Sequence, residues 1–352
     1  MSKGYFLVKS GIPEKAFRLQ ELSLPDLLPG QVVIEVEAFG LNFADVMARN
    51  GKYRDAPSLP FVPGYDIVGV VLRVHTPTDQ HWVGKRVAGF CRFGGYAQQV
   101  ITSVDAIADI NEISSAHALS LCTQGVTASF MADMIPSVHK GSYALVHAAA
   151  GGVGSLLLQL LHVKGIHTIA KVRSQDKVAA LNHVNPTHVI VSGQLNYENK
   201  VKDIVGKEGL IASFNAVAGI TVKTDLKLLS NGGTLFLFGG AGILHSKFGV
   251  FSLLNFVRKT GIYSPIPLMM QSKGIIGVNM LKIADDNPSL LAYHLKLCFE
   301  RYKNQLLIPI PATIFHHSEL HLAHRQLESG NSTGKLVVYW GDLDGERNDL
   351  KK

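Results

Sequence analysis

The residues with the clearest chemical use form a glycine-rich turn, AAGGVG at positions 149–154. An apolar run at 143–147 precedes it, and a run at 155–163 that is apolar on nearly every face follows it. This order predicts a strand, a turn and a buried helix whose N-terminus meets the pyrophosphate of a dinucleotide. The turn departs from the G-x-G-x-x-G pattern at Ala149 and could be an ordinary connection, but its context favours a dinucleotide site. The candidate contacts are Ala150, Gly151, Gly152, Val153 and Gly154.

Residues beyond the second β-rich run, 167–172, indicate which dinucleotide binds. A site specific for NAD needs an acidic residue about 20 positions past the start of the motif, to bind the ribose 2′-hydroxyl. Here the first acidic residue is Asp176, and basic residues surround it. Lysine and arginine attract a 2′-phosphate through charge-assisted bonds of about 1.5–3 kcal/mol each, whereas a carboxylate repels it. We therefore predict NADPH rather than NADH, although solvated surface cations would look the same; the candidate contacts are Lys171, Arg173, Ser174 and Lys177.

Alternating strands and helices must position this turn. We expect strands at 188–192, 211–217 and 234–238, and helices at 177–184, 198–205 and 224–230. Such alternation predicts a parallel sheet with right-handed crossovers, whose ligands lie beyond the carboxyl ends of the strands. Glycine-rich strand ends could be plain turns, but we expect them to line the cofactor groove through Ala218, Gly239 and Gly240.

The remainder of the chain predicts a second, mostly β domain. Residues 4–116 are β-rich and punctuated by proline and glycine, and an apolar helical stretch at 114–135 leads into the nucleotide-binding unit. The last elements resemble this first region in pattern, so we expect the C-terminus to fold back onto it. They are a strand at 274–280, helices at 286–302 and 317–327, strands at 308–315 and 335–340, and a disordered charged tail at 342–352.

The composition excludes several classes of protein. At 352 residues, with 47% hydrophobic and 17% charged, the chain suits two folded domains. The net charge of +7 attracts anions, but no dense basic run is interleaved with aromatic residues, so we predict no nucleic-acid partner. Three separated cysteines without a C-x-x-C pattern, Cys91, Cys122 and Cys298, predict reduced thiols. Without a signal-like start or about 20 successive apolar residues, we predict no transmembrane segment and a cytoplasmic protein.

Residues 245–273 interrupt the alternation with a long apolar and aromatic stretch. It could cap the active site, form a subunit interface or lie on a membrane surface. It could equally be an insertion that packs on its own domain.

Four motifs in this order resemble the quinone oxidoreductase branch of the medium-chain dehydrogenase/reductase superfamily, over essentially the whole chain. They are GLNFAD at 40–45 with Arg49, Gly51 and Tyr53, PGYD at 63–66 with Gly69, GGYA at 94–97, and the turn at 149–154. The resemblance implies an α/β protein with a GroES-like, mostly-β catalytic domain of residues 1–118 completed by 283–352. A Rossmann domain with a doubly wound parallel sheet would span 119–282 and include the insertion 245–273, which looks like that of the VAT-1-like subgroup. It also implies an active site in the cleft between the domains, NADPH as hydride donor and a homodimer.

The resemblance further implies which residues act on a substrate. Matching family positions place Asn42, Asp45 and Tyr53 on the substrate side as candidate hydrogen-bond donors, with Tyr53 able to supply a proton. Asp45 could instead only cap a helix, and Tyr53 could be wall packing. Asn279 is expected near the nicotinamide.

Metal binding is not expected. Zinc-dependent members of the superfamily have cysteine where this chain has Asn42 and histidine where it has Tyr65, so we predict no zinc. On a helix His317, His321 and His324 would share one face and could bind a metal, but we favour a solvent-exposed face.

The leading prediction is a zinc-independent reductase that transfers hydride from NADPH to quinones or α,β-unsaturated carbonyls. An enoyl-thioester reductase would use the same chemistry. The other alternative is a VAT-1-like, NADPH-binding interaction protein with little turnover, for which peripheral contact with a membrane stays open.

Overall fold

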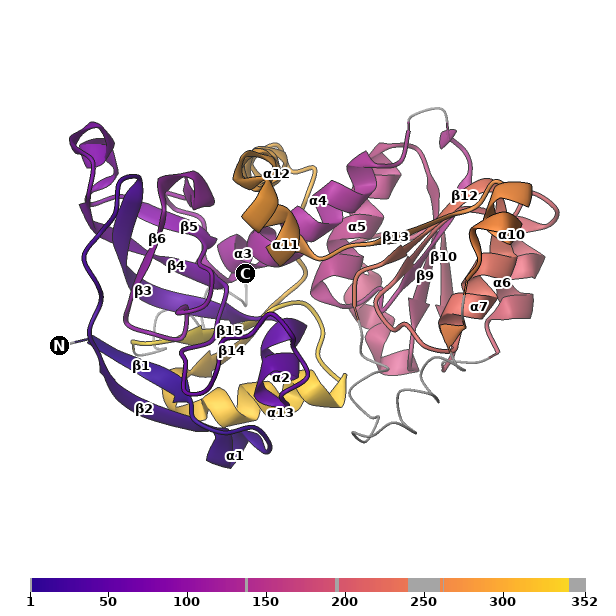
Figure 1. Ribbon diagram of the computed structural model, residues 1–352. Coiled ribbons are helices and arrows are strands. Elements are labelled where there is room, and N and C mark those ends of the chain that lie inside the picture. Colours follow the sequence, from indigo (N-terminus) through magenta and orange to yellow (C-terminus); the bar gives the residue numbers. More distant parts are fainter. Residues whose placement is uncertain (1, 137–138, 194–195, 240–259, 262, 342–352) are drawn as a thin grey trace. The chain divides into compact units, whose positions relative to one another are not determined.

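The computed structural model describes residues 2–136, 139–193, 196–239, 260–261 and 263–341 (Figure 1). The chain divides into two units. Unit 1 comprises Met1–Thr127 and Met280–Lys352, and unit 2 comprises Ala128–Asn279. The sequence predicted the divisions at 118/119 and 282/283. A mostly-β unit and a doubly wound α/β unit confirm the predicted fold class.

Unit 2 is built on six parallel strands in the order β10-β9-β8-β11-β12-β13. The strand order reverses between β8 and β11, and open parallel sheets bind their ligands at such a switch point. The glycine-rich turn follows β8, so the topology puts it at that point. The strands are β8 (Tyr143–His147), β9 (His167–Val172), β10 (His188–Val191), β11 (Leu210–Asn215), β12 (Leu229–Leu237) and β13 (Gly274–Gly277).

Helices cover both faces of this sheet (Figure 1). On one face α5 (Gly152–Val163) packs against β8 and β9. On the other, α6 (Glu198–Val205) and α7 (Thr221–Leu228) pack over a core that includes Leu145 of β8. Successive side chains of a strand point to opposite faces, so β8 and its neighbours are apolar on both.

Two elements of unit 2 differ from expectation. The helix predicted at 177–184 is wrong: the 3-10 turns Gln175–Lys177 and Ala179–Leu181 stand there. Asn185 adopts a φ of 46° and precedes a proline, so no helix propagates through it. β12 begins before the predicted 234 because its glycines allow close approach: a Cβ at Gly233 would lie 2.7 Å from the Leu210 carbonyl oxygen.

Unit 1 centres on a seven-stranded sheet in which β14-β15-β3-β4-β5-β7 are neighbours and β6 also pairs with β3. β15 runs antiparallel to β3, so C-terminal residues complete the sheet of the N-terminal region. β1 and β2 form a separate antiparallel pair. The strands are β1 (Ser2–Leu7), β2 (Phe17–Leu22), β3 (Gln31–Leu41), β4 (Asp66–Val74), β5 (Arg86–Phe90), β6 (Gln99–Ser103), β7 (Ile107–Asp109), β14 (Thr313–His316) and β15 (Leu336–Tyr339).

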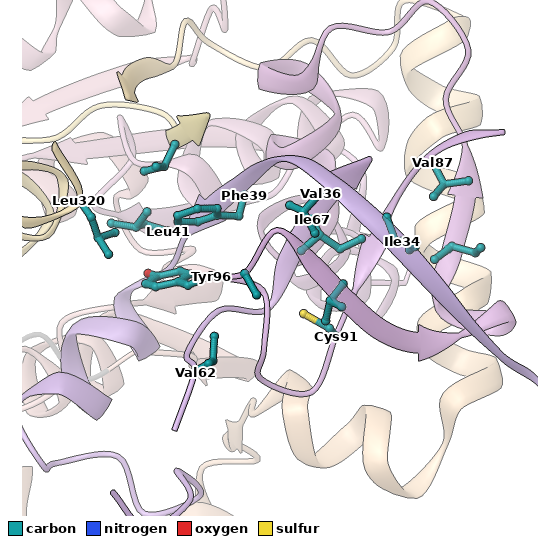
Figure 2. Close-up of a cluster of buried hydrophobic side chains, with 14 of the residues drawn as sticks. Ile34, Val36, Phe39, Leu41, Val62, Ile67, Val87, Cys91, Tyr96 and Leu320 are labelled. Carbon is teal, nitrogen blue, oxygen red and sulfur yellow. The ribbon is translucent and has the colours of Figure 1, made fainter. Parts of the chain in front are cut away.

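Because β3 contains a β-bulge, side chains from both halves of this strand point into the same core. Its pairing with β4 shifts register between Val36 and Ala38. Ile34 and Val36 before the shift and Phe39 and Leu41 after it therefore all enter one buried cluster, despite the change from even to odd positions (Figure 2). Tyr96, whose hydroxyl reaches toward the candidate site described below, belongs to the same cluster.

The helices of unit 1 flank this sheet and carry part of the candidate site. α12 begins at Pro288, whose missing N–H suits a first turn, and Asn287 caps it by accepting from the Leu290 N–H at 3.2 Å. The segment predicted as one helix at 114–135 is α3 (Ser115–Ser120), a π-helical turn (Leu121–Gly125) and α4 (Val126–Asp133), which crosses into unit 2. The others are α1 (Pro13–Ala16), α2 (Phe43–Arg49), α11 (Met280–Asp286), α12 (Pro288–Lys303) and α13 (Leu320–Ser329).

Some predicted features lie outside the described residues, namely Gly240, positions 245–259 and 262 of the insertion, and the tail 342–352. The rest of the insertion includes α10 (Pro265–Met270). Across the described residues, no helix combines the length and the apolar character needed to cross a bilayer.

Candidate functional site

The glycine-rich turn of unit 2 joins β8 directly to α5. Gly151 is the N-cap of α5 in an extended conformation. A Cβ at Gly154 would lie 2.6 Å from the Ala148 carbonyl oxygen, so only glycine lets the helix start this close to the strand. The first four N–H groups of a helix have no partner within it and, with the helix dipole, attract phosphate. The predicted contacts at 150–154 are thus together at one helix N-terminus.

Lys171 is directed into the unit rather than toward solvent. Its side chain is buried in β9, and its Nζ donates to the Ser192 carbonyl oxygen at 3.3 Å. The same ammonium lies 4.9 Å from the centre of the Tyr197 ring. Burial lowers the pKa of Lys171 to about 8, and the charge of Asp225 opposes that shift. Its predicted role at the 2′-phosphate stays a prediction.

The other predicted phosphate contacts follow the end of β9. Arg173 is exposed, and Ser174 and Lys177 are half-buried. Burial lowers the pKa of Lys177, with Asp176 opposing the shift and Arg173 adding to it. The two cations therefore lie within electrostatic range of each other, which suits a doubly charged phosphate.

A buried polar network fixes the turn after β11, where Ala218 has a φ of 60°. The Asn215 Oδ1 accepts from the N–H groups of Val217 and Ala218, both at 2.9 Å. Its Nδ2 donates to Asp225 at 2.6 Å, and Asp225 also lies 3.0 Å from His147. Although burial raises the pKa of Asp225, His147 and its other hydrogen-bond partners hold it below the usual range. A carboxylate that stays ionised thus anchors the predicted groove.

The remaining predicted contacts of unit 2 lie at strand ends. Gly239 follows β12, and a Cβ there would lie 2.5 Å from the Ala216 carbonyl oxygen, so the two strand ends approach closely. Asn279 is exposed just beyond β13.

In unit 1 the predicted substrate residue Asn42 is part of a buried ion pair. Lys335 and Asp66 form that pair, and neither side chain is exposed. The Asn42 Nδ2 donates to Asp66 at 2.8 Å, and its Oδ1 accepts from Lys335 at 2.9 Å. Asp66 also accepts from the Thr123 N–H at 3.1 Å and from the Thr123 hydroxyl. Gly40 makes room, since a Cβ there would lie 2.3 Å from the Lys335 Cε. Both ends of the Asn42 carboxamide are therefore engaged within the protein.

Asp45 both caps a helix and carries an unusual carboxyl group. One oxygen accepts from the Asn42 N–H at 2.7 Å and so caps α2, but Oδ1 is buried without a hydrogen-bond partner among the described residues. Burial raises the pKa of Asp45 from 3.8 to about 7; the Asn42 N–H opposes this shift and Asp66 adds to it. Near neutral pH the carboxyl is therefore only partly ionised.

This raised pKa makes stability depend on pH. The folded protein holds a proton that the unfolded chain releases near 3.8, so the stabilisation is complete below that pH and disappears as pH rises toward 7. A difference of about 3 pKa units corresponds to about 4 kcal/mol. Asp45→Asn removes this titration. The difference in unfolding free energy between the variant and the wild type should therefore change by about 4 kcal/mol, in favour of the variant, from pH 4 to pH 7.5. Urea denaturation across this range measures it, and a difference that does not change with pH would contradict the assignment.

Tyr53 and Tyr65 lie beside this carboxyl group. Their ring centres are 6.5 Å apart with one ring edge-on to the other. The Tyr65 hydroxyl is buried and has no hydrogen-bond partner among the described residues. Burial raises the pKa of both phenols, and the charge of Asp45 raises them further. Asp45, Tyr65 and the half-buried Tyr53 thus form one electrostatically coupled group.

The prediction that His317, His321 and His324 share a solvent-exposed face is wrong for His324. His324 is buried rather than solvent-exposed, and its Nε2 lies 3.2 Å from the Tyr96 hydroxyl. His317 pairs instead with the Tyr5 hydroxyl, 3.0 Å from its Nδ1. Burial lowers the pKa of both histidines. These two rings hydrogen-bond to different tyrosines and do not converge on one point.

Two stretches match known protein families. Residues 28–112 match the family described as "Alcohol dehydrogenase GroES-like domain", and residues 152–290 match "Zinc-binding dehydrogenase". A "Probable quinone oxidoreductase" of Schizosaccharomyces pombe is 30% identical, over 93% of this chain and 94% of its own length.

Other relatives have different names. The "Synaptic vesicle membrane protein VAT-1 homolog-like" of Mus musculus is 26% identical, over 91% of this chain and 77% of its own length. Among solved structures, a mycobacterial protein "complexed with NADPH" has a TM-score of 0.83 at 24% identity, covering 96% of this chain and all of its own. Similarity at that identity shows the fold.

The zinc named in the second family description does not fit the residues present. Zinc sites are built from cysteine, histidine and carboxylate ligands. Among the described residues, the carboxylate that hydrogen-bonds the Asn42 side chain is Asp66, and it is paired to the Lys335 ammonium, which would repel a dication. Within the described ranges, no group of three or more His, Cys, Asp or Glu could hold a metal ion.

Proposed function

Because this chain belongs to the quinone oxidoreductase branch of the medium-chain dehydrogenase/reductase superfamily, we propose that it is an NADPH-dependent, zinc-independent reductase of quinones or α,β-unsaturated carbonyls. The observation that carries the proposal is the cradle of residues 150–154 at the switch point of the unit 2 sheet, followed by Arg173 and Lys177. The names of the yeast quinone oxidoreductase and of the mycobacterial protein solved with NADPH support it.

NADPH would supply the hydride, and the chain's own residues would hold it. The α5 N-terminus would receive the pyrophosphate, and Arg173, Ser174 and Lys177 the 2′-phosphate, with Lys171 supporting them from within. Ala218, Gly239, Gly240 and Asn279 would line the path toward the nicotinamide. Asp225 would keep the Ala218 turn in place through Asn215.

The residues around Asn42 do not suit a zinc ion, and this favours an acceptor that can be reduced without a metal. Hydride addition to a quinone or an enone leaves a phenolate or an enolate, which is less basic than an alkoxide and needs less stabilisation. Hydrogen-bond donors can meet such an oxyanion without a Lewis acid. We assign Tyr53 as the proton donor and Asn42 and Asp45 as the groups that support it. We also propose that the protein is a homodimer and that it is located in the cytoplasm.

The test is anaerobic NADPH oxidation, against an NADH control, with an ortho-quinone and a simple enone as acceptors. Oxygen is excluded because semiquinone cycling imitates turnover. Turnover that prefers NADPH supports the proposal, and the faster acceptor identifies the substrate class. Tight NADPH binding without turnover of either acceptor would overturn it.

A second candidate function rests on α10. Three of its apolar side chains are largely exposed: Ile266 by 64%, Met269 by 76% and Met270 by 82%. Together with the VAT-1-like relatives, this favours a protein that binds NADPH and also contacts a membrane surface. Co-sedimentation with anionic liposomes that Met269→Glu/Met270→Glu abolishes would support it, and equal sedimentation of both proteins would exclude α10 from such a role.

A further inference from the structure

Two turns of the proposed cofactor site each contain an alanine in a backbone conformation that alanine rarely adopts. Ala148 directly follows β8 and has a φ of 49°, and Ala218 lies shortly after β11 and has a φ of 60°. The Cβ atom makes this left-handed region unfavourable, so such a residue persists only where its surroundings fix it. The groups that fix the two alanines therefore also fix the shape of both turns.

Hydrogen bonds hold both sides of Ala218. Its N–H donates to the Asn215 Oδ1 at 2.9 Å, and its carbonyl oxygen accepts from the Thr221 hydroxyl at 3.0 Å. The Asn215 Nδ2 in turn donates to the Thr221 hydroxyl at 2.8 Å and to Asp225 at 2.6 Å. The side chains of all three polar residues are buried, so these hydrogen bonds are shielded from water. The chain of contacts that holds Ala218 thus ends at the Asp225 carboxylate.

The carbonyl group of Ala148 lies at the centre of the glycine-rich turn. Its oxygen accepts from the Gly151 N–H at 2.8 Å and would lie 2.6 Å from a Cβ at Gly154. The preceding residue, His147, ends β8, and its buried Nε2 lies 3.0 Å from Asp225. The side chain next to this alanine is therefore anchored on the same carboxylate.

The sheet brings these two anchors to one carboxylate. β8 and β11 are parallel neighbours in which Val146 lies opposite Phe214. Their last residues, His147 and Asn215, therefore lie side by side and point to the same face of the sheet. α7 packs over that face and supplies Asp225 between them.

Asp225 suits this position because it stays ionised. A carboxylate only accepts hydrogen bonds, and its two oxygens can take several at once. Besides the two anchors, the Tyr197 hydroxyl donates to it at 2.5 Å and the Ser213 hydroxyl at 2.9 Å. Although burial raises the pKa of Asp225, His147, Tyr197 and Asn215 hold it below the usual range. The carboxylate is thus itself fixed from several directions.

We propose that Asp225 is a positioning residue for the cofactor, whose carboxylate holds the Ala148 and Ala218 turns in the shape that binds the dinucleotide. It acts through His147 on one turn and through Asn215 and Thr221 on the other. The proposal rests on the assignment of these turns to NADPH in the function proposed above. A network that served only the stability of unit 2 would leave the affinity of the folded protein for NADPH unchanged.

The test compares two buried hydroxyl groups of this network. Thr221→Val removes the hydroxyl that holds the Ala218 carbonyl group, whereas Ser213→Ala removes a bond to Asp225 that reaches neither turn. Thr221→Val should raise the Kd for NADPH about tenfold, and Ser213→Ala should raise it less than about twofold. The Kd for NADH should rise by the same factor, because the Ala218 turn is not assigned to the 2′-phosphate. Fluorescence titration measures both constants, and circular dichroism establishes that each variant is folded.

Two further comparisons test each turn separately. Glycine adopts a positive φ without strain, so adding Ala218→Gly to Thr221→Val should recover most of the lost affinity. At the glycine-rich turn, His147→Gln keeps a side-chain N–H that can donate to Asp225, and His147→Leu does not. His147→Gln should therefore bind NADPH about tenfold more tightly than His147→Leu.

The outcomes separate this proposal from the function on which it rests. Folded Thr221→Val with the same Kd for NADPH as Ser213→Ala and the wild type would overturn the positioning role and leave the reductase function standing. Should Thr221→Val not fold, equal affinities of His147→Gln and His147→Leu would overturn the role. A wild type that does not bind NADPH would overturn the assignment of both turns to the cofactor.

Discussion

Replacing Lys335 with methionine is expected to destabilise unit 1 by about 3–5 kcal/mol, because it leaves the buried Asp66 carboxylate without its counter-charge. Asn42 and Thr123 would still donate to Asp66, but neutral donors do not compensate a full charge at a site without solvent. Both tryptophans of the chain, Trp82 and Trp340, lie in unit 1. Their fluorescence during urea denaturation therefore measures the stability of this unit.

Two further variants make this result specific. Adding Asp66→Asn to Lys335→Met removes the unpaired negative charge of Asp66 and should restore most of the lost stability. Lys282→Met breaks an exposed pair with Asp55, 2.9 Å long and with the lysine 53% exposed, and should cost less than about 1 kcal/mol. A loss as small for Lys335→Met as for Lys282→Met would mean that the buried pair contributes nothing beyond an ordinary surface pair.

Removing the two cations after β9 should remove the preference for NADPH. Each charge-assisted bond to a phosphate contributes about 1.5–3 kcal/mol, so Arg173→Ala/Lys177→Met should weaken NADPH binding by about 100-fold or more. NADH has no 2′-phosphate, so its Kd should change little. Fluorescence titration of the two cofactors measures the ratio directly.

A control separates specific contacts from general charge. Lys202→Met on α6 removes one positive charge from an exposed pair with Glu198 and should leave the NADPH-to-NADH ratio unchanged. If the double variant weakened the binding of NADPH and NADH equally, the two cations would attract the net charge of either cofactor and would not recognise the 2′-phosphate.

The architecture of unit 2 was predictable because its signals are local. Apolar runs of strand length alternate with helical segments, and the glycine turn marks the switch point. The helix predicted at 177–184 failed although its residues favour helix individually. The chain forms two short 3-10 turns there, and Asn185 and the proline after it prevent a helix from continuing beyond 184. The buried His324 was misjudged because helical spacing shows which residues share a face but not what packs against it.

The candidate site of unit 1 was only half predictable. Asn42, Asp45 and Tyr53 stand in one short segment, so a motif finds them. Lys335 is 269 positions from Asp66, and no local pattern indicates that a lysine will be buried against it. The pairing of β15 with β3 brings them together, and Gly40 opens the space. Only the folded structure shows that the Asp45 Oδ1 and the Tyr65 hydroxyl are buried without a hydrogen-bond partner among the described residues.

The most direct test of the reductase function is to follow the hydride itself. The protein would be incubated without oxygen with NADPH carrying deuterium at C4 of the nicotinamide, on one face or the other, and with the enone acceptor. We expect the saturated product to carry one deuterium at its β-carbon from one of the two labelled cofactors only. Product without deuterium from either, or no product while NADPH stays bound, would contradict hydride transfer by this protein.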